Sequence, residues 1–176
     1  MVTQYFTASS LDGFIAAEPE DGLAWLLSRD VDADGPQGYN AFIADVGALA
    51  MGATTYQWLL THAPDEWYYE MPTWVFTHRT FPAVPEGRDI RFTADPVPEV
   101  HAQMAGAAGE KNVWIVGGGE LAGQFHDHGL LDELWIQYAP LTLGAGAPLL
   151  PRRAEFEQIA LDENREFACR RLRVKK

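Results

Sequence analysis

The stretch VWIVGGGELAGQF, residues 113–125, constrains the fold more than any other segment of the chain. An apolar, β-rich run at 113–116 meets three consecutive glycines, and a helix-compatible segment begins at Glu120. This order predicts a strand, a tight turn and a helix whose first backbone N–H groups are free. Such a helix N-terminus attracts anions, and glycine lets a phosphate approach the backbone closely. The segment therefore favours a phosphate-bearing coenzyme as ligand, with a tight turn that binds nothing as the alternative.

The same glycines match the dinucleotide pattern G-x-G-x-x-G/A through Gly117, Gly119 and Ala122. A Rossmann site also needs an acidic residue about 20 positions further on, which holds a ribose. Tyr138 and Ala139 occupy that place, and the motif follows several other elements of the chain. The sequence thus argues against a standard Rossmann site.

Strand-like and helix-like segments alternate along the chain. Strands are expected at residues 2–9, 14–16, 48–51, 73–77, 90–93, 113–116, 133–141 and 167–174. Helices are expected at 23–28, 39–46, 54–60 and 97–108 and from Glu120 onward, and 143–151 is expected to be a loop. This alternation predicts a largely parallel α/β sheet covered by helices on both faces, in a single domain over residues 1–176. The closing strands lack an intervening long helix, which predicts an antiparallel edge.

Charge and composition restrict the class of protein. Twenty-five acidic against thirteen basic side chains give a formal net charge of −12, which argues against nucleic acid as a partner. No window reaches the length of a membrane span, and the N-terminus lacks the pattern of a signal peptide. Cys169 is the only cysteine, which excludes an intrachain disulfide and fits a reducing compartment. We expect a soluble cytoplasmic protein that holds an anionic coenzyme through local dipoles and a few cations.

A second strand–turn–helix unit is predicted at AMGATTYQWL, residues 50–59. Gly52 precedes a helix with Thr54 in the capping position, and Thr55 adds a further hydroxyl. In isolation the unit is an ordinary helix cap. Together with the glycine triplet it predicts a pyrophosphate that bridges two helix N-termini.

A third segment, TASSLDGFIA at residues 7–16, interrupts the first strand with a Leu-Asp-Gly turn. Backbone N–H and C=O groups exposed at such a break suit an amide, including the carboxamide of nicotinamide. Asp12 has two interpretations: a proton donor or hydrogen-bonding group for a substrate, or simply the aspartate of a preferred Asp-Gly turn.

These segments form a set that is characteristic of one superfamily. SLDGFIA, MGATTY, WVFTHR, VGGGELAGQF and DELWIQYAPLTLGAGAPLL occur in an order that resembles the dihydrofolate reductase superfamily. The chain is most similar to the bacterial branch that includes the C-terminal reductase domain of the riboflavin-pathway deaminase–reductase. The resemblance runs from about residue 2 to 151. It implies a mostly parallel, mixed sheet of about eight strands, NADPH as hydride donor, a small-molecule substrate and a homodimer.

The resemblance also implies roles for individual residues. The nicotinamide carboxamide would meet backbone groups of Ala8 and Ile15, and Asp12 would be the catalytic candidate near the reactive ring. The coenzyme pyrophosphate would lie at Gly52, Ala53, Thr54, Thr55, Val116, Gly117, Gly118, Gly119, Glu120 and Leu121. The adenosine ribose and its 2′-phosphate would lie near Thr77, His78 and Arg79.

Two departures from the family pattern bear on the reaction. Gly22 stands where folate-reducing relatives carry a carboxylate that contacts the pterin, and the neighbouring Asp21 would point elsewhere. Ala53 stands where relatives often carry an arginine for the 2′-phosphate, which weakens discrimination of NADP from NAD. We therefore expect NADPH with NADH possible, Arg79 or His78 compensating, and a reaction other than dihydrofolate reduction.

The leading hypothesis is an NAD(P)H-dependent reductase of a small pterin- or pyrimidine-like heterocycle or of a carbonyl compound. The alternatives are a non-catalytic nucleotide-binding or regulatory module on the same fold, and a protein that binds a flavin or deazaflavin. The cluster of Trp67, Tyr68, Tyr69 and Trp74 fits stacking on a heterocycle, a dimer interface, or a loop packed on the sheet. No metal site is expected, because His126 and His128 are two residues apart and do not share a helix face.

Overall fold

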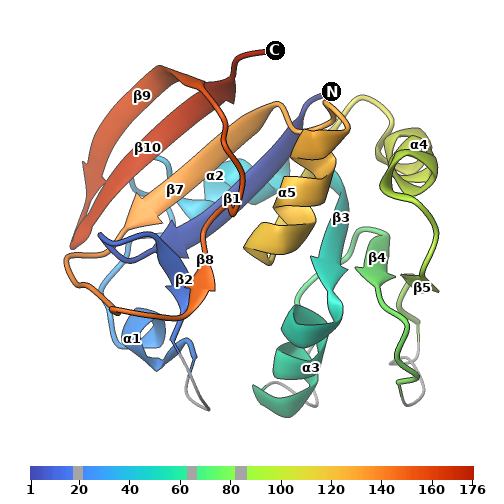
Figure 1. Ribbon diagram of the computed structural model, residues 1–176, viewed down its shortest axis with the longest axis horizontal. Coiled ribbons are helices and arrows are strands. Elements are labelled where there is room, and N and C mark those ends of the chain that lie inside the picture. Colours follow the sequence, from blue (N-terminus) through green and yellow to red (C-terminus); the bar gives the residue numbers. More distant parts are fainter. Residues whose placement is uncertain (18–21, 63–66, 82–86) are drawn as a thin grey trace.

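A computed structural model describes residues 1–17, 22–62, 67–81 and 87–176. An eight-stranded sheet forms its centre, in the order β5-β4-β3-β6-β1-β7-β10-β9 (Figure 1). These strands are β1 (Thr3–Ser9), β3 (Val46–Gly52), β4 (Thr73–Phe76), β5 (Ile90–Thr93), β6 (Asn112–Gly117), β7 (Glu133–Tyr138), β9 (Phe156–Asn164) and β10 (Phe167–Val174). A separate two-stranded sheet pairs β2 (Phe14–Ala16) with β8 (Ala147–Pro148). The helices are α1 (Ala24–Leu27), α2 (Tyr39–Ala44), α3 (Ala53–His62), α4 (Val97–Ala108) and α5 (Gly119–Asp127).

The sheet is mostly parallel, as expected from the alternation of strands and helices. The strands from β5 to β7 pair in parallel, and β10 and β9 add an antiparallel edge. This arrangement confirms the predicted fold class. None of the described helices is both long and apolar enough to cross a membrane.

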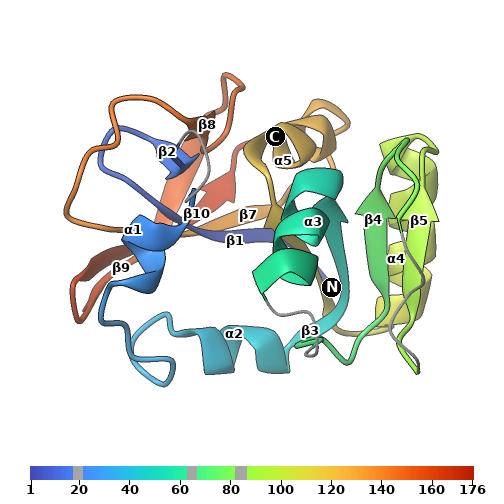
Figure 2. The ribbon, with the colours of Figure 1, turned by 90° about the horizontal axis from the view of Figure 1, so that it is seen from below.

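Helices cover both faces of the sheet, so the central strands are apolar on both sides. On β6, Val113 and Ile115 belong to the core beneath α4 and α5, whereas Trp114 belongs to the core beneath α2 and α3. Figure 2 shows α5 and α2 on opposite sides of the sheet. Side chains that alternate along one strand therefore serve two separate cores.

Two elements were not predicted. β9 was missed because most of its side chains are exposed or half-buried, as on an edge strand, and its segment FEQIALDEN gives no continuous apolar run. β8 is only two residues long and lies within the expected 143–151 loop.

Several predicted boundaries differ from the observed ones, and three of them matter most for the course of the chain. Helix α2 ends at Ala44, and Val46 begins β3 instead of closing the helix. β7 ends at Tyr138 rather than at Leu141, because Pro140 has no N–H with which to continue a ladder. Helix α5 begins one residue before Glu120, at Gly119.

Candidate functional site

The predicted coenzyme segments all follow strands that end at one edge of the sheet. The arrowheads of β1, β3, β4 and β7 point toward the same lower edge in Figure 1. Along that edge, in the strand order β4-β3-β6-β1, lie residues 77–79, 52–55, 117–121 and 8–15. In α/β sheets ligands bind outside the carboxyl ends of parallel strands. The structure thus gathers the predicted segments where such a fold binds ligands.

The glycine triplet forms the predicted turn between β6 and α5. Gly118 is the N-cap residue of α5, with an extended backbone and no side-chain cap. The first N–H groups of the helix, from Gly119, Glu120 and Leu121, therefore meet the edge without a capping side chain. The Gly117–Gly118 peptide bond is cis.

The three glycines differ in what surrounds them. A Cβ on Gly119 would lie 2.5 Å from the carbonyl oxygen of Leu149 and closer still to that of Pro148. A Cβ on Gly118 would meet only the Ile15 side chain, at 3.6 Å, and one on Gly117 would lie 3.5 Å from Thr55 Oγ1. Packing against the β8 segment explains why residue 119 is a glycine. At Gly117 and Gly118 the protein leaves room for a Cβ, so packing does not explain those two glycines.

The turn before α3 lies beside the glycine triplet. Met51 pairs with Gly117 across β3 and β6, and a Cβ on Gly52 would meet only the Gly117 carbonyl oxygen, at 3.9 Å. The helix begins at Ala53, so the prediction that Thr54 caps it was wrong: Thr54 is the second helical residue. Gly52 and the hydroxyl of Thr55 border the same space as Gly117, which brings two helix N-termini together.

β1 opens away from β6 at this edge. The β1–β6 ladder ends at Tyr5, whereas β1 continues to pair with β7 as far as Ser9. The carbonyl oxygens of Thr3 and Ser9 accept hydrogen bonds from N–H groups on the β7 side. The Val2 carbonyl oxygen instead accepts one from the Val113 N–H on the β6 side. By this alternation the backbone N–H and C=O of Ala8 face β6, with no strand paired there.

Ala8 therefore presents backbone groups toward the gap. Its carbonyl oxygen receives the hydroxyl of the adjacent Thr7 at 3.2 Å, and its side chain is buried. Ile15 reaches the other side of the gap from β2, next to Gly118. The Ala8 backbone thus has the exposure expected of a group that binds an amide, whereas Ile15 is placed here by its side chain and its backbone role stays a prediction.

Asp12 lies in the turn between β1 and β2, and its carboxylate is an acceptor. It receives hydrogen bonds from the Ser10 hydroxyl at 2.6 Å and from the backbone N–H groups of Leu143 and Gly144 at 3.0 and 2.7 Å. The Ser10 hydrogen bond, followed by the Leu143 one, lowers the pKa of Asp12 to about 2. These contacts favour the turn interpretation, and a role for Asp12 in a reaction stays a prediction.

The Leu143 and Gly144 amides are the part of the site that sequence reasoning missed. They lie in the predicted loop, where the glycines of the run LGAGAP gave a signal. Gly144 and Gly146 both have positive φ values, of 76° and 145°. Such glycines indicate a loop of defined shape rather than a loose connection.

The side chains of Glu120, Ala53 and Gly22 bring no free charge to the site, and for Ala53 and Gly22 this was expected from the sequence. The Glu120 carboxylate forms an ion pair with Arg152 at 2.8 Å, so only its backbone N–H faces the edge freely. Ala53 adds no charge. The Gly22 carbonyl oxygen accepts a hydrogen bond from the Trp25 indole N–H at 3.0 Å. Asp21 lies outside the described residues.

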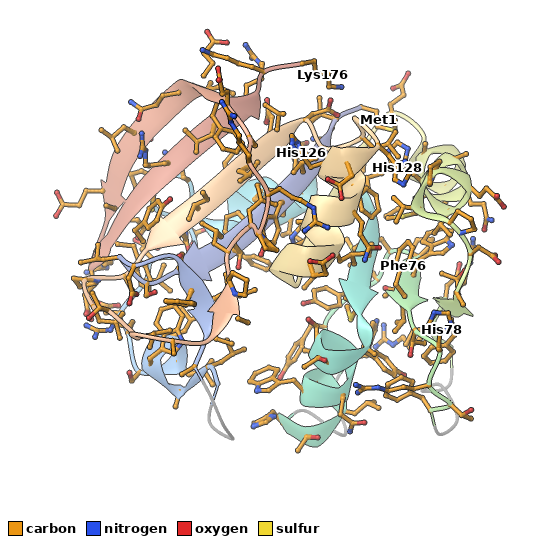
Figure 3. The ribbon with its side chains drawn as sticks, in the orientation of Figure 1. Met1, Phe76, His78, His126, His128 and Lys176 are labelled. Atoms are coloured by element: carbon orange, nitrogen blue, oxygen red, sulfur yellow. The ribbon has the colours of Figure 1, made fainter. Side chains whose placement is uncertain are left out.

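The adenosine segment lies one strand further along the edge. Phe76 pairs with Gly52, and Thr77 then accepts the Arg79 N–H on its hydroxyl at 2.8 Å. His78 and Arg79 are exposed, and Figure 3 shows His78 just beyond the end of β4. The Arg79 guanidinium and the His78 imidazole are thus available beside the α3 turn.

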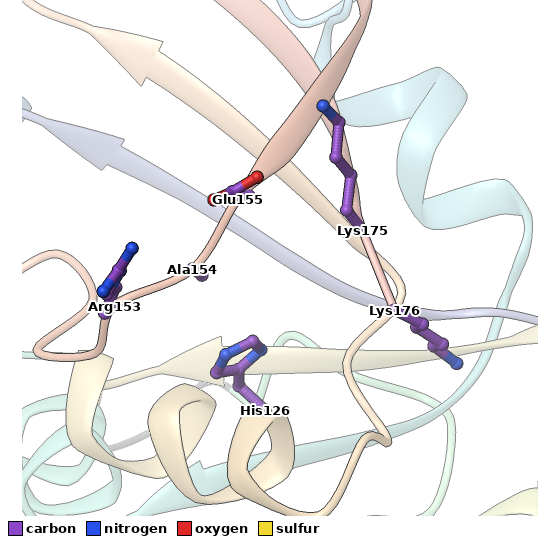
Figure 4. Close-up of a pocket in the computed structure, with 6 residues that line it drawn as sticks. All are labelled: His126, Arg153, Ala154, Glu155, Lys175 and Lys176. Carbon is purple, nitrogen blue, oxygen red and sulfur yellow. The ribbon is translucent and has the colours of Figure 1, made fainter.

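A separate hollow of about 430 Å³ lies at the opposite edge of the sheet (Figure 4). His126, Arg153, Ala154, Glu155, Lys175 and Lys176 line it. None of them belongs to the predicted site, and the Lys176 ammonium is already paired with Asp132 at 2.8 Å. The hollow therefore is not part of the candidate site.

Comparisons with known proteins agree with this geometry. The family model of the RibD C-terminal domain matches residues 68–173. The uncharacterized protein YwjB of Bacillus subtilis (strain 168) is 28% identical over 165 residues, which cover 94% of this chain and 91% of that protein. A crystal structure from Shewanella sp. PV-4, provisionally assigned to riboflavin biosynthesis, has a TM-score of 0.82, 28% identity and full coverage of both chains.

A more distant neighbour links the fold to dihydrofolate reductase. Dihydrofolate reductase from Enterococcus faecalis, solved in complex with NADP(H) and RAB-propyl, has a TM-score of 0.62 at 16% identity. The alignment covers 99% of this chain and 97% of that one. At this identity the likeness concerns the fold alone. With the family match over residues 68–173, the chain belongs to the RibD C-terminal domain family, and its fold is like that of dihydrofolate reductase.

Proposed function

We propose that the protein is an NAD(P)H-dependent reductase whose coenzyme lies along the carboxyl edge of the parallel strands. The observation that carries the proposal is the juxtaposition of two helix N-termini, at Gly52 and Gly118, beside the open backbone of Ala8. A dinucleotide needs these two features together, because its pyrophosphate binds helix N-termini and its carboxamide binds backbone groups.

The coenzyme would run across the strand order. Its nicotinamide would lie at Ala8 and Ile15, its pyrophosphate between the α3 and α5 turns, and its adenosine near Thr77. His78 and Arg79 would supply positive charge for a 2′-phosphate in place of the arginine that Ala53 replaces. This supports NADPH as the preferred donor, with NADH accepted.

The acceptor would be a planar heterocycle. Trp114 and Phe6 lie on the face of the sheet that α2 covers. Trp114 stands two residues before the predicted coenzyme contact Val116, and Phe6 stands two residues before Ala8. The rings of Tyr39 and Tyr69, both half-buried, lie with centroids 6.0 and 5.5 Å from Trp114. Trp114 and Phe6 are themselves buried, so the surface open to a ligand would come from Tyr39 and Tyr69, and aromatic surface favours stacking on a flat ring over binding of an aliphatic carbonyl compound.

Catalysis would depend on alignment of the two rings. The Asp12 pKa of about 2 makes its carboxyl a poor proton donor at neutral pH, and Gly22 offers no acidic side chain. Holding hydride donor and acceptor in contact removes much of the entropic barrier of a bimolecular step. We expect solvent to supply the proton.

The test is a titration followed by a turnover assay. NADPH binding is measured by coenzyme fluorescence and thermal shift, and oxidation is then followed with pterin, pyrimidine and aliphatic carbonyl acceptors. Oxidation with a heterocycle supports the proposal. Binding without turnover on any acceptor favours the non-catalytic module, which the glycine at 22 and the alanine at 53 also suit. If neither NADPH nor NADH binds, both the reductase proposal and the non-catalytic nucleotide-binding module are refuted.

Two remaining expectations have their own measurements. A visible absorption spectrum of the purified protein tests for a flavin or deazaflavin in place of the nicotinamide coenzyme. Analytical ultracentrifugation tests the homodimer that the family resemblance implies.

A further inference from the structure

Asp12 connects two segments that are far apart in the chain. Besides its hydrogen bonds to the N–H groups of Leu143 and Gly144, the adjacent Leu11 N–H donates to the Leu141 carbonyl oxygen at 2.8 Å. The Ser10 hydroxyl orients the carboxylate from the other side. Hydrogen bonds to an ionised acceptor are the strong class of hydrogen bond. The turn after β1 is therefore fastened to the loop after β7.

The fastened loop leads directly into the small β2–β8 sheet. Phe14 pairs with Pro148, and the Leu149 N–H donates to the Gly13 carbonyl oxygen at 2.8 Å. A Cβ on Gly146 would overlap the backbone carbonyl of Ala16, so the loop and β2 are in direct backbone contact. The contacts of Asp12, Gly13 and Gly146 thus hold β2 and β8 together as a compact two-stranded ribbon, the β2–β8 ribbon.

The ribbon in turn lies against the glycine turn. The carbonyl oxygens of Pro148 and Leu149 on β8 occupy the space beside Gly119, and Ile15 on β2 approaches Gly118. A shift of the ribbon would move Ile15 relative to Gly118 and Ala8. A two-residue strand such as β8 has little pairing of its own to prevent that shift.

The geometry points to Asp12 as a positioning residue: its carboxylate fixes the 141–149 loop and the β2–β8 ribbon, and so holds Ile15 at the nicotinamide side of the cleft. The inference rests on the proposed function for the identity of the ligand, but not for the fastening itself. It also separates Asp12 from proton transfer, because the carboxylate is engaged as an acceptor from three donors.

The first experiment needs no ligand. Hydrogen exchange by mass spectrometry compares peptides that cover residues 141–149 in wild type, Asp12→Ala, Asp12→Asn and the control Asp45→Ala. Asp45 is an exposed aspartate at the opposite edge, and no side-chain hydrogen bond to another described residue is found for it. Loss of a charged acceptor should speed exchange of these peptides by about tenfold in Asp12→Ala. Asp12→Asn keeps one acceptor oxygen, so the exchange rate of its 141–149 peptides should lie between those of wild type and Asp12→Ala.

The second experiment uses NADPH itself. We expect Asp12→Ala to raise the Kd of NADPH by about tenfold, as the ordering of the ribbon must then accompany binding. Asp12→Asn should recover part of that loss. The pH profile of turnover should keep its shape in both variants, because no proton is transferred from this carboxyl.

The outcomes distinguish the inference from the proposed function. Unchanged exchange at 141–149 in Asp12→Ala would overturn the fastening, whether or not NADPH binds. Faster exchange with an unaltered NADPH Kd would overturn the positioning of Ile15. Loss of one limb of the pH profile in Asp12→Asn, with coenzyme affinity intact, would make Asp12 a proton donor instead. If wild type binds no NADPH, the proposed function fails and the exchange data still decide the fastening.

Discussion

Gly119→Ala tests whether the third glycine serves packing rather than a ligand. The added methyl would lie 2.5 Å from the Leu149 carbonyl oxygen, where an ordinary contact begins at 3.4 Å. The β8 backbone must therefore retreat by about 1 Å, and overpacking of this kind costs about 2 kcal/mol. For a chain of 176 residues such a loss lowers Tm by roughly 4 to 8 °C. Differential scanning calorimetry of the ligand-free protein measures it.

The matched control is Gly52→Ala, in the neighbouring turn between β3 and α3. Its methyl would meet only the Gly117 carbonyl oxygen at 3.9 Å, an ordinary contact. We expect Tm to change by less than about 2 °C, while the NADPH Kd rises about tenfold because the pyrophosphate loses close access to the backbone. An unaltered Tm in Gly119→Ala would refute the packing argument. An unaltered Kd in Gly52→Ala would remove Gly52 from the coenzyme site.

Three further predictions concern charge. Because the pKa of Asp12 in the folded protein, about 2, lies below its ordinary value of 3.8, its contribution to stability is present above pH 4 and is lost toward pH 2; the urea midpoints of wild type and Asp12→Ala should converge over that range. Arg171→Leu should cost about 2 kcal/mol, because it leaves the buried Glu133 carboxylate without the cation that lies 2.9 Å away, and urea unfolding should show recovery when Glu133→Leu is added. Arg79→Ala should weaken NADPH by about tenfold and NADH by little, since only NADPH has a 2′-phosphate to pair with it; equal weakening in fluorescence titrations would contradict that assignment.

The central strands and the glycine turn could be predicted because their signals are local. The apolar run before Gly117 fits a strand buried on both faces, and the alternation of elements determines a parallel sheet. β9 could not be predicted, since an edge strand with exposed side chains resembles a polar loop. Thr54 was assigned to the cap by residue preference, whereas the helix begins one residue earlier.

The candidate site was predicted by segment but not by contact. The sequence identified SLDG and LGAGAP separately, yet nothing local indicates that Asp12 binds the Leu143 and Gly144 amides, more than 100 positions away in the chain. The direction of the Ala8 backbone likewise depends on where the β1–β6 ladder ends, which is a property of two strands together. Long-range register therefore decides the parts that the sequence left open.

The early end of the β1–β6 ladder has a consequence for the protein without its ligand. A sheet that opens in its middle has an internal edge, where side chains take the place of a paired strand: the Trp114 indole donates to the Phe6 carbonyl oxygen and the Thr7 hydroxyl to that of Ala8. A bound amide would act as a missing strand residue, and would join the halves into one continuous hydrogen-bonded sheet.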